Sequence, residues 1–414
     1  MRKVSFIHYK MRLPDYKERP LYVNKISPYI GKQIIKVITG QRRVGKSYIL
    51  FNLIDFIKDK DPQANIIYIN CELEQFLQIK SHEDLLKYVK QQLKPGVNNY
   101  LLIDEIQEIS SFELALRSLF AENICDITCS GSNANMLSGE LATYLSGRYI
   151  EFNIHSLSYS EFLQFHSFNS SPESVLKYLK YGGMPYLIQI GLNEDMPFEY
   201  LRNVYATILL RDVVARENIR NVPFLENLIQ YLAGNVGNLF SANNISRYLK
   251  SQRISMSPQL VINYLKALTN AYFIHKVVRA NVEGLKIFEI GEKYYFEDLG
   301  LRNALWGQTQ KMDLHQLVEN AVFLHLKQLG YNVFVGQLGT QEIDFVAEKQ
   351  GFKVYVQVCL QLSKEKTMNR EFGNLLQIKD NYPKYVVSLN EPLIGHNYKG
   401  IIHLNLHDFL INDL

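Results

Sequence analysis

Cysteine is scarce in this chain of 414 residues, which contains only four. They are Cys71, Cys125, Cys129 and Cys359. No two of them form a C-x-x-C pair, and this spacing disfavours both a zinc site and a disulfide framework. A chain without disulfides is typical of a reducing compartment, so we expect the protein in the cytoplasm.

Long apolar runs are also missing, because no window approaches the roughly 18 consecutive apolar residues of a membrane-spanning helix. Charged residues appear early, at Lys10, Arg12 and Asp15, so we expect no signal peptide. The net charge of +4 is small and permits an anionic partner without requiring one. These absences leave an ordinary globular protein, and 414 residues indicate two or three domains rather than one core.

The most informative segment spells G-x-x-x-x-G-K-S, the phosphate-binding loop of nucleoside triphosphatases. Its residues are Gly40, Gln41, Arg42, Arg43, Val44, Gly45, Lys46 and Ser47. A β-branched run at 34–39 precedes it and apolar residues at helical spacing follow it, as the motif requires. The loop predicts ATP binding, with Lys46 on the β- and γ-phosphates, Ser47 on Mg²⁺, and Tyr48 in the same nucleotide-binding segment. The sequence leaves open whether Arg42 and Arg43 contact nucleotide, a partner or solvent.

An acidic pair supplies the second half of this predicted site. The apolar run Tyr100–Ile103 is typical of a buried parallel strand, and Asp104 and Glu105 follow it. Ligands bind at the carboxyl ends of strands in open α/β sheets. We therefore predict that Asp104 holds Mg²⁺ and that Glu105 orients or deprotonates the attacking water. The alternative is that two solvated carboxylates simply end a strand.

An extra strand pattern at 65–70, together with the adjacent acidic pair, resembles the AAA+/STAND branch of P-loop ATPases. The resemblance implies a polar sensor after the next strand, and Ser132 or Asn133 suits that role unless the segment is an ordinary polar turn. Arg148 is the first candidate for an arginine that stabilises the transferred phosphoryl group, in cis or on a neighbouring subunit. Its alternative is a surface or ion-paired arginine.

The resemblance extends over essentially the whole chain, to a bacterial and archaeal "ATP-binding protein" family with an AAA+-type ATPase and a C-terminal domain of unknown function. The segments that carry it are 40–47, 101–107 (LLIDEIQ), 130–133, 145–148, 157–163 (LSYSEFL), 181–185 and 210–213. It implies ATP binding and hydrolysis with Mg²⁺, without assigning a biological role. AAA+ relatives include homo-oligomers, and the sequence does not decide this point.

The predicted fold class is α/β, with a P-loop NTPase parallel sheet, a helical lid, a winged helix and a C-terminal nuclease-like α/β domain. The expected domains are the ATPase core with its lead-in at 1–155, the lid at 156–221, the winged helix-turn-helix at 222–311 and the nuclease-like domain at 312–414. A capping box, Ser158 to Glu161, begins the lid.

Three helix patterns and a β-hairpin between 222 and 290 resemble a winged helix-turn-helix. Pro258 begins the third helix, which would be the one to enter a DNA major groove. The polar candidates for DNA contact are Gln252, Arg253, Gln259, Asn263 and Lys266. Because the local charge is weak, DNA and a protein partner are both open.

The C-terminal patterns, a helix at 314–329 followed by three strands, resemble the PD-(D/E)xK nuclease fold. Glu319 and Asp344 occupy metal-ligand positions in that resemblance, and the metal would be Mg²⁺. The third strand should carry E-x-K or Q-x-K, but this chain has Gln357-Val358-Cys359. A cysteine cannot replace a cationic lysine.

Lys353 or Lys364 could take over from the missing lysine, although no sequence pattern supports either. We therefore expect a relic that does not cleave but still binds nucleic acid or a protein partner. In the simpler alternative, both acids are structural. The sequence thus predicts an ATPase that acts as a nucleotide-dependent switch for DNA or protein partners, and its alternative is an ATP-coupled DNA-processing nuclease.

Overall fold

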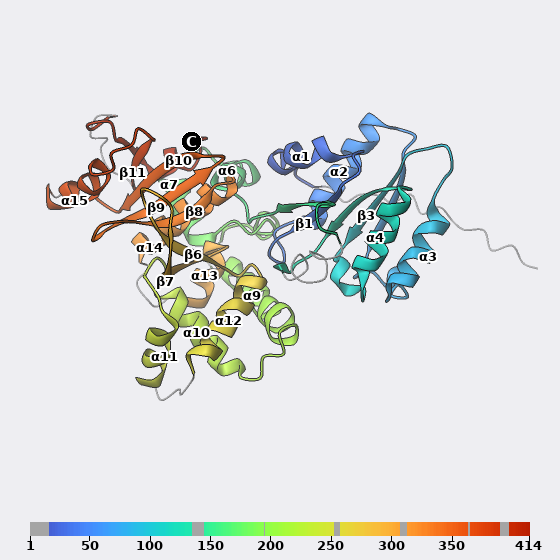
Figure 1. Cartoon of the computed structure of the whole chain (residues 1–414), viewed down its shortest axis with the longest axis horizontal. Helices are drawn as coiled ribbons and strands as arrows, with labels where there is room; N and C mark the ends of the chain where they lie inside the picture. Colours follow the sequence, from blue (N-terminus) through green and yellow to red (C-terminus); the bar gives the residue numbers. More distant parts are fainter. Residues whose placement is uncertain are drawn as a thin grey trace, which may run out of the picture. The chain divides into compact units, whose positions relative to one another are not determined.

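A computed structural model describes residues 16–134, 145–193, 195–251, 257–306, 313–362, 365–389 and 397–414 (Figure 1). The chain divides into two compact units. The first unit takes its described residues from Met1–Ile38, Gly45–Gly131 and Glu140–Phe152, and the second takes them from Thr39–Val44, Ser132–Gly139 and Asn153–Leu414.

A five-stranded sheet, in the order β2-β3-β4-β1-β5, organises the described part of the first unit. Its strands are β1 (Ile35–Thr39), β2 (Asn65–Asn70), β3 (Asn99–Asp104), β4 (Asp126–Ser130) and β5 (Tyr149–Asn153). β1 pairs with β4, β4 with β3 and β3 with β2, all in parallel, and Val37 lies opposite Cys129. The predicted α/β fold with a parallel P-loop-type sheet is confirmed.

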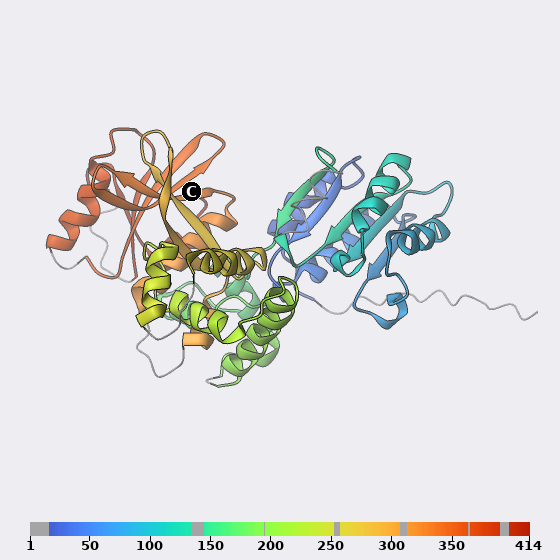
Figure 2. The same cartoon turned by 60° about the horizontal axis from the view of Figure 1, so that its bottom comes forward.

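Helices cover both faces of this sheet. The chain crosses the sheet in one direction from β1 to β2 and in the other direction from β2 to β3 and β4, so right-handed crossovers place the connecting helices on opposite faces. Helices α1 (Pro20–Ile26) and α2 (Lys46–Lys60) lie on one face, and α3 (His82–Gln92) and α4 (Phe112–Glu122) lie on the other (Figures 1 and 2). The short 3₁₀ turns are η1 (Ser27–Tyr29), η2 (Glu74–Phe76) and η3 (Ile106–Glu108). Because both faces are covered, the strands β1 and β3 are rich in apolar residues.

A charged pair is buried within the sheet of the first unit. Lys36 on β1 is fully buried and ion-pairs with Asp126, the first residue of β4. Burial lowers the pKa of Lys36, while Asp126 opposes that shift by favouring the charged ammonium group. Asp126 also accepts a hydrogen bond from the Gly31 backbone N–H at 2.7 Å. The pair therefore fixes the start of β4 against β1.

Helices form the next part of the chain, which belongs to the second unit. They are α6 (Tyr159–His166), α7 (Pro172–Tyr181), α8 (Leu187–Ile190), α9 (Met196–Thr207) and the π-helix η5 (Ile208–Ala215). The predicted capping box is present, because Ser158 Oγ accepts from Glu161 N–H at 3.2 Å and Glu161 Oε2 accepts from Ser158 N–H at 2.9 Å. The predicted helical pattern is therefore observed here.

Three more helices and a hairpin follow, as the sequence predicts. They are α10 (Val222–Ala233), α11 (Ala242–Ser251), α12 (Pro258–Asn270) and the antiparallel strands β6 (Ile274–Asn281) and β7 (Ile287–Phe296). The buried stripe of α12 is Val261, Tyr264, Leu265 and Leu268, and its exposed polar residues include Gln259, Asn263 and Lys266. The other two proposed DNA contacts, Gln252 and Arg253, lie outside the described residues.

The hairpin is not an isolated wing, because it forms one edge of a seven-stranded sheet in the described part of the second unit. The strand order is β12-β11-β10-β9-β8-β6-β7, and β6 pairs with β8 in parallel. The other strands are β8 (Asn332–Leu338), β9 (Gln341–Lys349), β10 (Phe352–Cys359), β11 (Lys384–Ser388) and β12 (Ile402–Asn405). One sheet thus crosses the expected boundary near residue 311, and the domain boundaries stay predictions.

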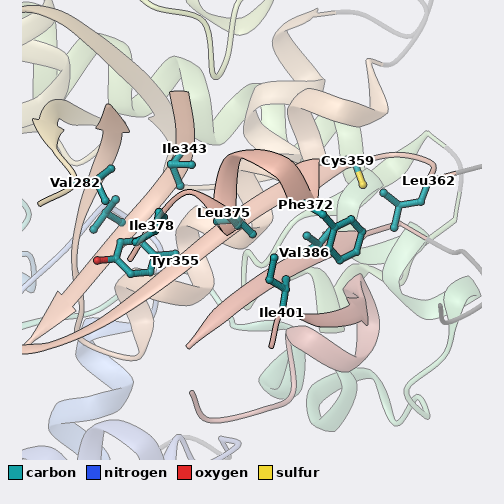
Figure 3. Close-up of a cluster of buried hydrophobic side chains, with 11 residues drawn as sticks. Val282, Ile343, Tyr355, Cys359, Leu362, Phe372, Leu375, Ile378, Val386 and Ile401 are labelled. Carbon is teal, nitrogen blue, oxygen red and sulfur yellow. The ribbon is translucent and has the colours of Figure 1, made fainter. Parts of the chain in front are cut away.

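Helices pack against this sheet. They are α13 (Leu299–Trp306), α14 (Leu314–Gln328), α15 (Glu365–Leu376) and α16 (Leu406–Phe409). Figure 3 shows the core beneath α15, where Phe372 and Leu375 meet Tyr355 of β10 and Val386 of β11, all fully or almost fully buried. Apolar burial of this kind contributes about 25 cal/mol per Å². Within the described residues, no helix combines the length and the apolar character that crossing a bilayer requires.

Gly183 gives a test of packing in the second unit. A Cβ atom at Gly183 would lie 2.3 Å from the Leu157 carbonyl oxygen. Because that oxygen belongs to the backbone, the clash could be relieved only by a costly backbone shift. We expect Gly183→Ala to lower the free energy of unfolding by about 1–3 kcal/mol, measured by chemical denaturation. The control is Gly373→Ala in α15, where an added Cβ meets no atom within 4 Å. Equal stability of the two variants would contradict this account.

Candidate functional site

The loop between β1 and α2 adopts the backbone conformations that a phosphate-binding loop needs. Gly40, Arg43 and Gly45 have φ angles of 140°, 71° and 96°. Glycine is required at position 40, because a Cβ there would lie 2.2 Å from the Ile154 carbonyl oxygen. Helix α2 begins at Lys46, so the partial positive charge of its N-terminus lies at the end of the loop.

The first unit brings together the four residues that were predicted to handle phosphate, Mg²⁺ and water. Lys46 Nζ lies 3.8 Å from Glu105 Oε1, and Ser47 hydrogen-bonds to the Asp104 carboxylate through its side chain. Lys46, Asp104 and Glu105 are all buried. The lysine, the hydroxyl and the two acids thus converge at the carboxyl end of β3, as a magnesium–triphosphate site requires.

Asp104 is the most deeply buried of these acids, at 1% exposure. Burial raises its pKa, and the hydrogen bonds from Ser130 and Ser47 partly oppose this shift. Tyr68 on β2 also donates to Asp104 Oδ2, at 3.3 Å. Ser130 hydrogen-bonds to Asp104 and accepts from the Glu105 N–H at 3.2 Å. The sequence did not single out Ser130, although its place at the end of β4, beside β3, was a usable signal.

Glu105 has a left-handed backbone, with φ 55° and ψ 50°. Such a conformation costs a non-glycine residue about 1–3 kcal/mol and is concentrated at functional sites. Gln107 donates a hydrogen bond to Glu105 Oε2, while Oε1 faces Lys46. The Glu105 carboxylate thus faces the first residue of α2, and its role toward the attacking water stays a prediction.

Arg42 lies in the loop itself and makes a buried ion pair within the second unit. Its Nε and Nη2 lie 2.8 Å and 3.2 Å from the two Asp212 carboxylate oxygens, a bidentate arrangement. Asp212 belongs to the π-helix η5, and Arg216 Nη1 lies 3.4 Å from it. The loop and the helical segment are therefore coupled through Arg42, a role that the sequence left open.

The remaining loop residues have different surroundings. Gln41 and Val44 are buried, and Arg43 is exposed. The positive charge of Arg43 acts to lower the pKa of the Tyr200 hydroxyl, against the effect of burial. Tyr48 keeps 44% of its surface exposed and packs edge-on against Phe51 in the first unit. An exposed aromatic ring one residue after the loop is suited to stacking on a base.

The proposed sensor and arginine residues lie at opposite ends of the strands. Ser132 and Asn133 are buried directly after β4, at its carboxyl end. Arg148 is exposed, and its carbonyl accepts a hydrogen bond from Ile35 N–H at 2.9 Å, at the amino end of β1. The phosphate loop follows the other end of that strand, about 13 Å away. This placement does not bring Arg148 to the loop in cis, and a role on a neighbouring subunit stays a prediction.

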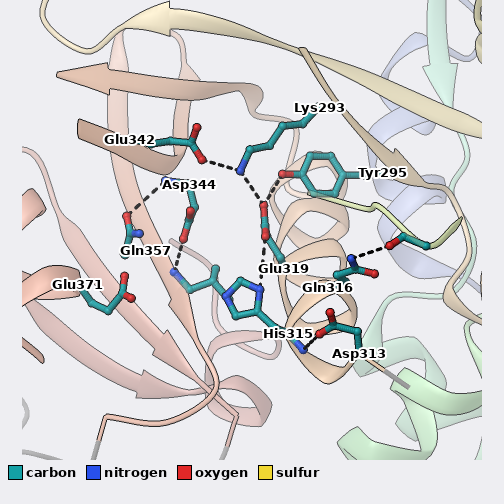
Figure 4. A network of polar contacts seen from close by, with 12 residues as sticks. Lys293, Tyr295, Asp313, His315, Gln316, Glu319, Glu342, Asp344, Gln357 and Glu371 are labelled. Carbon is teal, nitrogen blue, oxygen red and sulfur yellow. Dashed lines mark hydrogen bonds and ion pairs between the residues drawn. The ribbon is translucent and has the colours of Figure 1, made fainter. Parts of the chain in front are cut away.

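A second group of acids surrounds Lys293 in the C-terminal sheet (Figure 4). Lys293 Nζ, on β7, lies 3.1 Å from Glu319 on α14 and 2.9 Å from Glu342 on β9. Tyr295 Oη donates to Glu319 at 2.7 Å. Burial by itself would lower the pKa of Lys293, but Glu319, Asp344 and Glu342 outweigh it and raise that pKa. We call these five residues the lysine–acid cluster.

The lysine–acid cluster contains both acids that were predicted as metal ligands. Asp344 accepts from the Val358 N–H at 2.8 Å, and burial, followed by the charge of Glu319, raises its pKa well above the usual value. Glu371 on α15 is 1% exposed; its Oε1 is ion-paired with Arg370, and its Oε2 has no hydrogen-bond partner among the described residues. A buried carboxylate oxygen without a donor fits a cation in this position.

A lysine therefore lies beside these acids, but it comes from β7 and not from β10, where the predicted pattern lacked one. Lys353, one proposed substitute, lies near the Tyr382 ring instead, and Lys364 lies outside the described residues. Lys293 is far from the nuclease-like pattern in the sequence, and only the pairing of β7 with β6, and of β6 with β8, brings it to this sheet.

Comparison with protein-family models gives two matches. Residues 32–163 match a family described as an AAA domain, and residues 172–312 match a domain of unknown function. The first match confirms the predicted AAA+-type P-loop ATPase core. Neither match addresses the predicted winged helix or nuclease-like domain, which stay predictions.

Two relatives cover most of the chain. An uncharacterized protein of Haemophilus influenzae is 35% identical over 376 residues, which are 89% of this chain and 92% of the relative. An uncharacterized protein of Methanocaldococcus jannaschii is 30% identical over 392 residues, 90% of this chain and 85% of the relative.

Solved structures show more distant similarity. The Orc1 protein of Aeropyrum pernix, in complex with DNA, is 10% identical, with 70% of this chain and 93% of that chain covered and a TM-score of 0.33. A DNA polymerase III gamma subunit-related protein of Thermotoga maritima is 12% identical, with 74% and 85% covered and a TM-score of 0.29.

Asp104→Asn should raise the stability of the nucleotide-free protein. Because the pKa of folded Asp104 is raised, the folded state binds the proton more tightly than the unfolded state, and stability falls as pH rises from the ordinary aspartate pKa to the raised folded-state pKa, above which the loss is complete. Removing this buried charge should raise the melting temperature at pH 7 by roughly 2–4 °C, the shift that about 1 kcal/mol produces.

The contrasting variant for this experiment is Asp126→Asn, which leaves Lys36 buried without its partner. We expect it to lower the free energy of unfolding by about 3–5 kcal/mol. Differential scanning calorimetry without nucleotide measures both variants. A lower melting temperature for Asp104→Asn would show that its charge is already compensated in the folded protein.

Proposed function

We propose that this chain, which belongs to the same family as its Haemophilus influenzae and Methanocaldococcus jannaschii relatives and carries an AAA domain, binds Mg-ATP and hydrolyses it. The observation that carries the proposal is the convergence of Lys46, Ser47, Asp104 and Glu105 at the end of β3. The buried Asp104 carboxylate, with the Ser47 hydroxyl and the Glu105 carboxylate close to it, offers oxygen ligands of the kind that Mg²⁺ prefers.

Each residue would have a separate task. The loop N–H groups and Lys46 would hold the phosphates, and Ser47 and Asp104 would hold Mg²⁺, which neutralises charge on the phosphate oxygens. Glu105 would accept the proton of the attacking water or orient that water. Ser132 or Asn133 would sense the γ-phosphate. Phosphoryl transfer depends mainly on positioning and charge stabilisation, and these groups supply both.

We further propose that ATP acts as a switch through Arg42. The buried Arg42–Asp212 pair connects the phosphate loop to the π-helix η5. A change in the conformation of the loop would therefore be transmitted to the helical segment that leads to α10, α11 and α12. The exposed polar residues of α12 would then contact DNA or a protein partner. Homo-oligomerisation, with Arg148 acting on a neighbour, belongs to the same proposal.

A second candidate function, metal-dependent cleavage of nucleic acid, is favoured by the position of Lys293. Glu319, Asp344 and Glu371 are buried acids that would hold Mg²⁺, and the Glu371 Oε2 atom has no donor among the described residues. Lys293 would stabilise negative charge on the phosphate or activate water. The missing lysine was the reason to expect a relic, and a lysine from β7 removes that reason.

Glu105→Gln should separate ATP binding from hydrolysis. The glutamine keeps the size of the side chain but cannot accept the proton of water, so we expect turnover to fall by about 100-fold or more. Binding of Mg-ATP, measured by calorimetry, should stay within a few-fold of the original. Lys46→Ala should instead weaken binding about tenfold or more, since it removes a charge-assisted contact to phosphate.

The matched control is Glu108→Gln, which changes an exposed carboxylate one turn further along. We expect it to bind and hydrolyse ATP normally. The proposal fails if the original protein shows no heat with millimolar Mg-ATP, or if Glu105→Gln hydrolyses ATP at the original rate.

The second candidate function predicts nicking of supercoiled DNA that depends on Mg²⁺ or Mn²⁺ and on Lys293. Asp344→Ala should abolish nicking, and Lys293→Met should reduce it by about 100-fold, the typical loss for a charge-stabilising group. Agarose gels with each metal measure the rate.

Lys353→Met is the control, because Lys353 lies on the same sheet but outside the lysine–acid cluster. Nicking that survives in Asp344→Ala comes from a contaminant or another site. An original protein that never nicks DNA removes this second candidate and leaves the ATPase proposal untouched.

A further inference from the structure

Three side chains of the second unit, none of which belongs to either site described above, meet around one carboxylate. His155 follows β5, His275 lies on β6 and Glu297 follows β7. Glu297 Oε2 lies 3.0 Å from His155 Nδ1 and 2.5 Å from His275 Nε2. These three atoms all lie within 4.8 Å of one another. We call the three residues the His–Glu–His cluster.

The cluster is almost closed to solvent. His155 and Glu297 are buried, whereas His275 keeps 15% of its side chain exposed. Burial by itself would raise the pKa of Glu297, but His155 and His275 outweigh it and lower that pKa to about 2. Burial lowers the pKa of His275 and favours its neutral form. An ionised carboxylate and a neutral imidazole are the forms in which Glu297 and His275 would bind a metal.

Negative charge accumulates around the cluster. Asp298, next to Glu297, is also 1% exposed and accepts hydrogen bonds from the Gly183 and Leu301 N–H groups at 2.7 Å and 2.9 Å. The nearby cation is Lys327, whose pKa is lowered by burial despite the attraction of Glu297. A dication bound to Glu297 would further offset the charge of these two adjacent buried carboxylates, in addition to the contacts that they already make.

The donor set selects the class of cation. Two imidazole nitrogens and one carboxylate oxygen suit zinc and its first-row neighbours, whereas Mg²⁺ and Ca²⁺ prefer sites made of oxygen ligands. Three protein ligands also leave a coordination position for water. The partial exposure of His275 gives that position access to solvent.

We propose that the His–Glu–His cluster binds one transition-metal dication of the zinc class, through His155 Nδ1, His275 Nε2 and Glu297 Oε2. The hydrogen bonds around the cluster hold the carboxylate in place. Ser156 N–H donates to Glu297 Oε1 at 2.9 Å, and Ser156 Oγ donates to the Glu297 carbonyl at 2.9 Å. Gln328 Nε2 in turn donates to the Ser156 carbonyl at 3.1 Å. Such supporting contacts are typical of metal sites.

Metal binding would clamp two distant segments of the second unit together. His155 and Ser156 precede the helical segment, while His275 and Glu297 belong to the edge hairpin of the seven-stranded sheet. A dication bridging them stabilises the folded state, because the unfolded chain does not hold the three ligands in place. The site therefore predicts a metal-dependent increase in melting temperature that requires no nucleotide.

The test uses the untagged full chain after dialysis against EDTA, without nucleotide. Co²⁺ is titrated while visible absorption is recorded, and Zn²⁺ is titrated by calorimetry. We expect one metal per chain, ligand-field absorption from Co²⁺, and a melting temperature raised by roughly 5 °C at about 100-fold excess of Zn²⁺ over its Kd. His275→Gln and Glu297→Gln should each weaken binding about tenfold or more.

His82→Gln is the control, because His82 lies on α3 in the first unit, outside the cluster. It should bind metal like the original protein. Circular dichroism shows whether each variant is folded, and the stoichiometry of the original protein tests the site even if a variant is not. Absence of stoichiometric Co²⁺ binding, or unchanged affinity in folded His275→Gln, overturns the proposal and leaves a hydrogen-bonded triad without metal.

Discussion

A buried negative charge at the end of β3 is the constraint on which the nucleotide site depends. Asp104 is almost inaccessible to water, and burial works against its ionised form. The hydroxyls of Ser47 and Ser130, and the ammonium group of Lys46, offset part of that cost. Because β4 and the loop at the start of α2 supply these groups to an acid on β3, the chemistry of the site depends on the register of the sheet.

The second unit organises its chemistry along one strand. Lys293 and Tyr295 lie two residues apart on β7, so their side chains share one face, and Glu297 directly follows the strand. The first two contact Glu319, and the third contacts both histidines of the His–Glu–His cluster. A strand at the edge of a sheet thus serves two polar clusters, which explains its unusual content of buried charge.

The sequence predicted those features whose residues lie close together along the chain. The loop at 40–47, the acids at the end of β3 and the capping box at Ser158 are local patterns, and each is found where the sequence placed it. Local spacing sufficed because each pattern lies within one turn or one strand end.

What the sequence missed depends on contacts between distant segments. Ser130 reaches Asp104 across the sheet, Arg42 reaches Asp212 over 170 positions, and Lys293 reaches Glu319 only because β7 joins the C-terminal sheet. The contact of Arg148 with Ile35 likewise depends on strand pairing and places it at the amino end of β1, and a catalytic role for Arg148 on a neighbouring subunit stays a prediction. Pairing partners and strand direction set these positions, and no single-segment pattern encodes them.

The hairpin carries an irregularity that bears on how this region can vary. The pairing of β6 and β7 shifts register between Val278 and Ala280, toward the tip and away from Lys293. Insertions or deletions at the tip can be absorbed there without rotating the body of β7. A slip of one position on the other side of the shift would turn Lys293 and Glu297 outward together, since side chains alternate along a strand. The tip of the hairpin can therefore vary in length, whereas the body of β7 has to keep the same residues on the same face.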